Sequence, residues 1–319
     1  MFEISRRDVV FGAAAAYAMF GLSKPIAFIG AAEAQPAQAP AFRKYKVGDF
    51  EVVSLYDGIW EKPHDETFVK DVSLDETKRA LRAWGQTDAF VAFPITTLAV
   101  KTPAGLVLID TGTRGALGPK SGLLPQSMAA AGIDPKTAKT IIISHFHSDH
   151  ISGMIEKDTN APLFPDAEII VPATEMKWWT QPLESLPAGR QGGARLVQAS
   201  LAKWKNVRVA DDSSEPVPGI RLVPAFGHTQ GHTGQIISSG GKTFFSTVDV
   251  ATNPALFLKN PGWLASNDHV PEQAAETRRK VFDQAVADKM MVSGYHWGLP
   301  NVGTISKDGN GYAFVPAEG

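Results

Sequence analysis

The sequence predicts an α/β protein whose sheets are covered by helices on their outer faces. Short runs of apolar and β-branched residues, such as Ile141–Ile143, recur along the chain and are typical of buried strands. Segments with the apolar spacing of a helix, such as Val270–Ala287, lie between groups of these runs. Because both kinds of element must bury an apolar face, layered sheets covered by helices are the expected arrangement.

Length and composition fit one large domain or two closely packed halves. The 319 residues are 44% hydrophobic and 20% charged, which is ordinary for a globular protein. The formal net charge is −2, from 31 basic and 33 acidic residues, so no basic excess points to nucleic acid. The chain has no cysteine, which excludes disulfides.

The first half of the chain alternates strands with short helices. Strands are expected at Val47–Leu55, Ile95–Val100, Leu106–Ile109, Ile141–Ile143 and Glu168–Val171. Helices are expected at Gln126–Ala131, which ends near Gly132, at Pro172–Thr180 and at Ala194–Trp204.

The second half begins with three strands and ends with a hairpin. The strands are expected at Ile220–Pro224, Gly234–Ser238 and Thr243–Thr247. The strongest helix pattern follows at Val270–Ala287, with Asp268 as its expected cap and Pro271 in its first turn. Two final strands flank Asp308-Gly309, which is a hairpin signal.

The stretch His145–His150 places four candidate metal ligands, three histidines and an aspartate, directly after a predicted strand. On one loop they cannot all bind a single ion tetrahedrally without strain, but divided into two pairs they can serve two neighbouring ions. Imidazole together with carboxylate suits zinc, with iron, manganese and cobalt as competitors. His228, Asp249 and His296 also follow apolar segments, so each is expected where a strand ends in a loop.

Taken in order, these residues resemble the motifs of the metallo-β-lactamase superfamily. The matching parts are the HxHxDH stretch His145–His150, the GHTxGH stretch Gly227–His232, Asp249 after a strand, and the late His296. The segment Leu108-Ile109-Asp110-Thr111-Gly112 resembles the family's first motif. The resemblance covers about residues 45–315 and implies an αββα sandwich with its metals in a cleft along one edge of the two sheets.

The resemblance also implies a role for each site residue. His145, His147 and His228 would hold one ion, while Asp149, His150 and His296 would hold the other, and Asp249 would bridge the two. Asp110 would orient the metal loop, and His232 would hold a ligand or backbone group in place. His64 and His269 match nothing in the family pattern, and we assign them no role.

Two such ions, about 3.5–4 Å apart, would hold a bridging hydroxide that attacks a carbonyl or phosphoryl centre. Asp149 would orient this nucleophile and carry its proton toward the leaving group. No serine or cysteine nucleophile is needed for this reaction.

The N-terminus is typical of an export signal. Residues 5–10, Ser-Arg-Arg-Asp-Val-Val, resemble a twin-arginine motif, and an apolar stretch follows from Val9 to Leu22. Ala32-Glu33-Ala34 offers a cleavage site. We therefore expect a signal at residues 1–34, a linker at 35–44, a single hydrolase domain at 45–319, and a periplasmic location. An uncleaved N-terminal anchor is the alternative.

Within the superfamily, the chain most resembles the methyl parathion hydrolase group and its lactonase and arylesterase relatives. Gly48-Asp49-Phe50-Glu51, Leu117-Gly118-Pro119 and Gly311–Pro316 carry that resemblance. Trp178 and Trp179 fall where this group places a pocket aromatic, although tryptophans at helical positions also commonly pack in a core. Leu117 occupies one expected pocket position.

Two positions differ from those of well-known groups within the superfamily. Thr252 stands where the best-known acyl-homoserine lactonases have a tyrosine that donates a proton. Asp249 stands where the largest lactamase subclass has a cysteine and another subclass a serine.

We therefore expect a dinuclear metal-dependent hydrolase of a small, largely uncharged ester, lactone or phosphotriester. An acyl-homoserine lactonase and a β-lactam hydrolase are alternatives, and a metal-bearing binding protein without turnover is the alternative from a different class. The expected cofactor is two divalent ions, most simply zinc. The expected partner is a small molecule, with no nucleic acid and no stable membrane association after signal cleavage, and a homodimer is left open.

Overall fold

The computed structural model describes residues 41–318, all within one compact unit. Among these residues, no helix is long and apolar enough to cross a membrane. The expected signal at residues 1–34 lies outside the described residues and stays a prediction, which fractionation of expressing cells would test.

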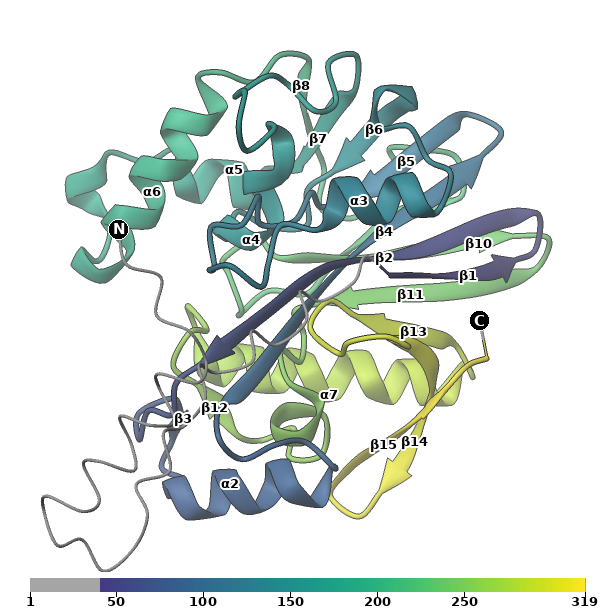
Figure 1. Ribbon diagram of the computed structural model, residues 1–319. Helices are drawn as coiled ribbons and strands as arrows, with labels where there is room; N and C mark the ends of the chain where they lie inside the picture. Colours follow the sequence, from purple (N-terminus) through teal and green to yellow (C-terminus); the bar gives the residue numbers. More distant parts are fainter. Residues whose placement is uncertain (1–40, 319) are drawn as a thin grey trace, which may run out of the picture. The chain divides into compact units, whose positions relative to one another are not determined.

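Two large sheets face each other, and helices lie on both outer sides (Figure 1). In spatial order, the first sheet contains β1 Phe42–Val47, β2 Phe50–Lys62, β4 Val91–Thr102, β5 Gly105–Ile109, β6 Ala138–Ile142, β7 Glu168–Pro172 and β8 Val207–Ala210. The second contains β15 Gly311–Pro316, β14 Val302–Asp308, β13 Met291–Gly294, β11 Lys242–Val248, β10 Thr233–Ser239 and β9 Ile220–Pro224. A separate two-stranded sheet pairs β12 Leu264–Ala265 with β3 Val69–Lys70.

Helices cover each sheet on the side that faces away from the other sheet. The α-helices are α2 Leu74–Ala83, α3 Leu124–Ala130, α4 Ser148–Ile151, α5 Ala173–Trp179, α6 Ala188–Leu201 and α7 Pro271–Ala287. Short 3₁₀ turns lie at Pro135–Thr137, Ser152–Met154 and Leu183–Ser185, and a π-helical turn lies at Pro254–Leu258. Figure 1 shows α3, α5 and α6 on one side of the sandwich and α2 and α7 on the other.

Alternating side chains divide the core into three layers. On β5, Leu108 packs with the helices α3, α5 and α6, whereas its neighbour Ile109 packs between the sheets. On β11, Phe245 packs with α7 and Phe244 packs between the sheets. Because neighbouring residues of a strand point to opposite faces, each strand contributes to two layers. The predicted αββα sandwich is thus confirmed.

The expected strand Val47–Leu55 is correct only from Phe50 onward, because a hairpin turn separates Val47, the last residue of β1, from β2. β1 pairs with β2 around a turn at Gly48, whose φ is +58°. A Cβ at Gly48 would lie 2.2 Å from the carbonyl oxygen of Ser239, so this turn requires glycine. β1 begins at Phe42, and the end of the expected linker 35–44 therefore belongs to the sheet.

Two further differences concern helices. Helix α6 begins at Ala188 rather than at the expected Ala194. Helix α2 was not predicted, although Ser73 caps it by accepting a hydrogen bond from the Glu76 backbone N–H at 3.3 Å. The other expected elements are present, with ends shifted by a few residues.

Candidate dinuclear metal centre

The predicted metal ligands lie just beyond the ends of four strands. The stretch His145–His150 follows β6 of the first sheet and includes the short helix α4. His228 follows β9, Asp249 follows β11, and His296 follows β13, all in the second sheet. Both sheets therefore contribute ligands to one edge of the sandwich, as the strand-end pattern indicated.

The ligand atoms form two groups, and within each group they lie within 4.8 Å of one another. In the first group, Nδ1 of His147 lies 3.0 Å from Nε2 of His145 and 2.9 Å from Nε2 of His228. Asp249 completes this group, with Oδ2 at 3.2 Å from Nε2 of His228. Three ring nitrogens and a carboxylate that converge in this way form a tetrahedral-type donor set.

The second group consists of Asp149, His150 and His296. Oδ2 of Asp149 lies 3.5 Å from Nε2 of His150 and 3.3 Å from Nε2 of His296. Oδ2 of Asp249 lies 3.5 Å and 3.3 Å from the same two nitrogens. One carboxylate oxygen of Asp249 thus lies between the two groups, which is where a bridging ligand belongs.

Two buried polar atoms at the centre lack a hydrogen-bond partner among the described residues and are suited to bind a cation. Nε2 of His150 and Oδ1 of Asp249 are buried and make no hydrogen bond within the described part of the chain. A buried polar atom without a partner is costly, so such atoms usually have a ligand. Imidazole nitrogens and carboxylate oxygens are the donors that zinc and related divalent ions take.

Neighbouring carboxylates raise the pKa of two ligand histidines. Burial alone would lower the pKa of His228, but hydrogen bonds to Asp249 and Asp268 raise it to about 9. Burial also opposes the shift at His296, whose pKa the nearby Asp249 and Asp149 raise to about 9. The carboxylates therefore favour a positive charge between the rings, and a bound divalent ion would release protons from these histidines.

Three ligand histidines are held by hydrogen bonds on the side away from the centre. Oδ2 of Asp110 lies 2.8 Å from Nδ1 of His150, which agrees with the expected orienting role of Asp110. Nδ1 of His228 lies 2.8 Å from Oδ1 of Asp268, and Nδ1 of His296 lies 2.9 Å from the carbonyl oxygen of Pro94. Such contacts fix ring orientation and tautomer.

Asp268 does not cap α7 as predicted. Val270 occupies the cap position without a side-chain hydrogen bond, whereas Asp268 is buried between His228 and Arg278. Its place beside a ligand 40 residues away has no local signal in the sequence.

His232 holds the backbone of a ligand. Its Nδ1 donates to the carbonyl oxygen of Ala225 at 3.0 Å, so its Nε2 is free to accept the Asp249 backbone N–H at 3.2 Å. Val248, just before Asp249, has φ +50°, which is rare for a β-branched residue. His232 thus supports a strained turn that aims Asp249 at the centre.

The predicted pocket residues are only partly at the site. Trp179 is 2% exposed, and its ring nitrogen donates to the buried Glu175 at 2.6 Å, so Trp179 belongs to the core and its pocket assignment is wrong. Thr252 is also only 2% exposed and offers no open pocket wall. Trp178 is partly exposed, and Leu117 is partly buried against Tyr295, which stacks on His150.

Sequence reasoning missed two aromatic neighbours and one histidine. The ring of Phe93 lies 5.4 Å from the His296 ring, and Trp60 lies 5.4 Å from Phe93. The His269 ring lies 5.6 Å from His147 and 4.7 Å from Trp178. His64 remains apart from the site, with Nε2 at 2.7 Å from the carbonyl oxygen of Asp88.

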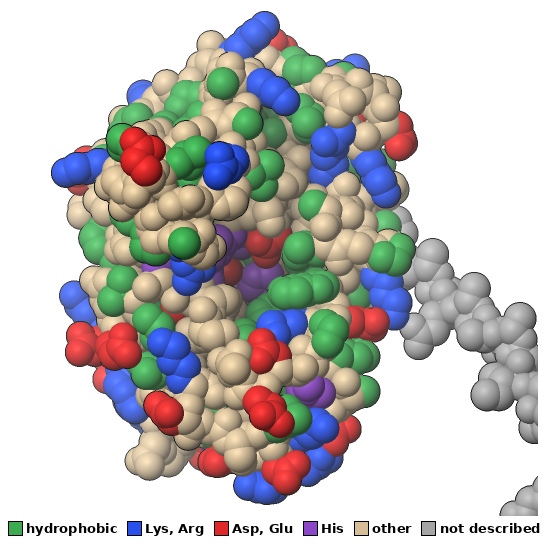
Figure 2. Space-filling view, turned by 90° about the vertical axis from the view of Figure 1, so that its left-hand side faces the viewer, with side chains coloured by type: hydrophobic (Ala, Val, Ile, Leu, Met, Phe, Trp, Pro, Cys, Tyr) green, Lys and Arg blue, Asp and Glu red, His purple; other side chains and the backbone are tan. Residues whose placement is uncertain are grey.

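Two of the seven ligand side chains reach solvent. His147 and Asp149 are partly exposed, whereas the other five ligands are buried. Figure 2 shows histidine and acidic side chains at the bottom of a hollow, with hydrophobic side chains beside them. A substrate would therefore approach past His147 and Asp149.

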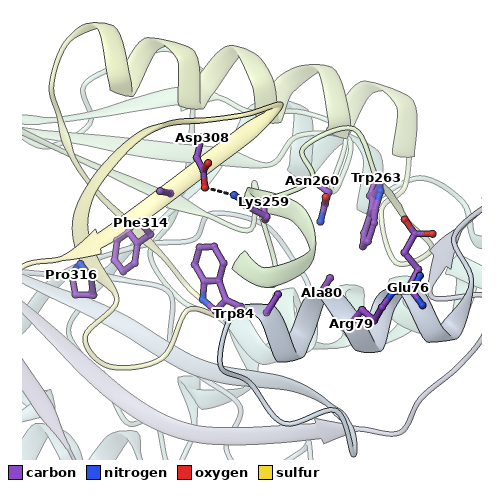
Figure 3. A pocket seen from close by; sticks show the side chains of 12 residues that line it. Glu76, Arg79, Ala80, Trp84, Lys259, Asn260, Trp263, Asp308, Phe314 and Pro316 are labelled. Atoms are coloured by element: carbon purple, nitrogen blue, oxygen red, sulfur yellow. Dashed lines mark hydrogen bonds and ion pairs between the residues drawn. The ribbon is translucent and has the colours of Figure 1, made fainter.

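A separate groove of about 700 Å³ lies between α2, the Lys259–Trp263 segment and the β14–β15 hairpin (Figure 3). Trp84, Trp263 and Phe314 supply its apolar surface, and Lys259 forms an ion pair with Asp308 there. None of the predicted site residues lines this groove, so it is not part of the metal centre.

A test of the two tryptophans follows from their burial. Trp179→Ala should lower the free energy of unfolding by roughly 3–5 kcal/mol, because it empties a core position. Trp178 is only partly buried against the same core, so Trp178→Ala should cost clearly less stability and should raise KM for aryl substrates by about 2- to 10-fold, the range of an aromatic contact. Denaturant unfolding and steady-state kinetics measure the two effects. Equal destabilisation by both changes would place Trp178 in the core as well.

A family model described as the metallo-beta-lactamase superfamily matches residues 91–288, from β4 to just beyond α7. The chain therefore belongs to the metallo-β-lactamase superfamily. Probable metallo-hydrolases of Mycobacterium bovis and Mycobacterium tuberculosis are each 29% identical to it over 182 residues, which is 49% of this chain and 56% of theirs. The chain thus spans about half the length of the curated relatives it matches.

Solved structures share the fold over a larger part of the chain. AidC, a dizinc quorum-quenching lactonase solved with a homoserine product, has a TM-score of 0.79 and 24% identity, covering 88% of this chain and 98% of its own. The hydrolase AbOPH has a TM-score of 0.81 and 23% identity, covering 88% and 99%. At these identities the likeness establishes the fold alone.

Proposed function

We propose that the chain is a dinuclear metal-dependent hydrolase that acts on a small, largely uncharged ester, lactone or phosphotriester. The observation that carries this proposal is the pair of ligand groups that share one oxygen of Asp249. Two divalent ions bound there, with zinc first and manganese, iron or cobalt as competitors, would supply hydroxide near neutral pH and polarise the oxygen under attack.

Side chains of the protein would carry the proton and contact the substrate. Asp149 lies at the open side of the centre, with its side chain 14% exposed against 3% for Asp249. It is therefore placed to take a proton from the nucleophile and pass it toward the leaving group. Trp178 is partly exposed and lies beside His269, which in turn lies beside the ligand His147, so its apolar surface near the centre favours an uncharged substrate.

A lactone is the substrate class with additional support. AidC, which shares the fold, is a lactonase. Thr252 argues against a mechanism that depends on a tyrosine at that position, and its side chain is only 2% exposed. An acyl-homoserine lactonase of this chain would therefore need Asp149 as the proton carrier. β-Lactam hydrolysis has no such supporting observation.

A substrate panel tests the proposal. Lactones, aryl esters and phosphotriesters would be offered to protein loaded with zinc or with manganese, and metal content would be measured by elemental analysis. We expect two ions per chain and turnover of at least one class that chelation abolishes. Two bound ions without turnover of any of the three classes would favour the metal-bearing binding protein instead.

A further inference from the structure

Glu175 on α5 is a fully buried carboxylate that the proposed reaction does not use. Four donors surround it. Oε1 accepts from the backbone N–H of Phe146 at 2.8 Å and from the ring nitrogen of Trp179 at 2.6 Å. Oε2 accepts from the hydroxyl of Thr229 at 2.7 Å and from the backbone N–H of Gly231 at 2.9 Å. Burial raises the pKa of this carboxyl, and the four hydrogen bonds oppose that rise.

Three of these donors belong to the two loops that carry the three histidines of the first ligand group. Phe146 lies between His145 and His147, and Thr229 directly follows His228. The second loop also packs tightly on α5, because a Cβ at Gly231 would lie 2.0 Å from the Glu175 backbone nitrogen. One side chain thus joins loops from different sheets at the point where their histidines meet.

The contacts of Glu175 are confined to one group. Asp149, His150 and His296 receive none of its hydrogen bonds, since His150 is held by Asp110 and His296 by Pro94. A carboxylate is also the only common side chain that fits. Glutamine has one acceptor oxygen, so its NH₂ would face at least one backbone N–H that cannot turn away.

We propose that Glu175 is a positioning residue that sets the distance between the His145–His147 loop and His228, and thereby the affinity of the first group for its ion. This inference rests on the proposed function for the presence of the ions. Residues that orient metal ligands typically change metal affinity by about 10- to 100-fold when they are replaced.

The experiment titrates metal-free protein with zinc in competition with a chelating dye. Glu175→Gln should weaken one of the two binding steps by about 10-fold or more and leave the other unchanged. The matched control is Trp179→Phe, which removes a donor from Oε1 but no bond to a ligand loop. It should retain both affinities.

Two backgrounds identify the weakened group. In a His296→Ala background, which keeps the first group intact, the effect of Glu175→Gln should persist. In a His147→Ala background, which disables the first group, it should vanish. If Glu175→Gln does not fold, Thr229→Val removes a single bond to Oε2 and should shift the same binding step by a smaller factor.

Equal weakening of both steps, or a lower Tm with both affinities intact, would overturn the positioning role. Failure of the wild-type protein to bind two ions would instead overturn the proposed function, so the two results are distinguishable.

Discussion

Asp249→Ala should reduce the metal content from two ions per chain to one or fewer and remove the hydrolytic activity. Oδ2 of Asp249 lies within 3.8 Å of ring nitrogens of four histidines, which are His145, His150, His228 and His296. Without the Asp249 carboxylate, no negative charge lies between the two ligand groups. The buried imidazole rings would then have to hold the divalent ions without it. Removing one partner of a buried charge pair typically costs about 3 kcal/mol or more, which corresponds to about 10²-fold in affinity.

Elemental analysis and chelator competition measure this loss. Asp249→Asn keeps an oxygen of similar shape without the charge, and should lose less metal than Asp249→Ala. Retention of two ions by Asp249→Ala would contradict a bridging role. His64→Ala provides a control, because His64 contacts the carbonyl of Asp88 away from the centre.

The ligands could be predicted from the sequence because each one sits where an apolar strand stops. That pattern depends only on local alternation and on the change from apolar to polar residues. The side chains that hold the ligands could not be found in the same way. Asp268 contacts His228 across 40 residues, and Glu175 contacts Gly231 across 56. Neither contact leaves a local periodic signal.

The tryptophans show a second limit of sequence reasoning. Trp178 and Trp179 are adjacent on α5, so their side chains point in directions about 100° apart on a helix with 3.6 residues per turn. Which of them faces the core depends on the angle at which α5 packs. The structure places Trp179 against Glu175 and leaves Trp178 partly exposed. From their positions in the sequence alone, either tryptophan could have been the one that packs in the core.

The turn at Gly48 shows the same limit at short range. Apolar residues lie on both sides of it, so the segment resembles one strand. The reversal depends on a left-handed backbone and on close contact with Ser239, which is distant in sequence. A glycine alone is consistent with either a turn or a bulge.

Asp149→Asn should lower kcat by about 10²-fold or more, the range typical of removing a positioned acid–base group, and by more than any loss of metal explains. Burial opposes ionisation of this side chain, but the charges of His150 and His296 hold the pKa of Asp149 below its usual range. The carboxylate is therefore ionised near neutral pH and can accept a proton. Asparagine keeps an oxygen of similar shape but cannot accept or carry that proton.

The backbone of residue 149 is held independently of its side chain. The Tyr295 hydroxyl donates to the Asp149 carbonyl oxygen at 2.7 Å, so the asparagine should occupy the same position. Steady-state kinetics, with metal content measured on the same samples, separate chemistry from metal loss. Ser148→Ala, which changes a neighbour outside the ligand set, should keep kcat near the wild-type value. If the fall in kcat merely follows the fraction of lost metal, Asp149 acts only as a ligand. If Asp149 carries a proton, kcat should fall even in samples that hold two ions per chain. Substrates whose leaving groups need no proton should lose less activity.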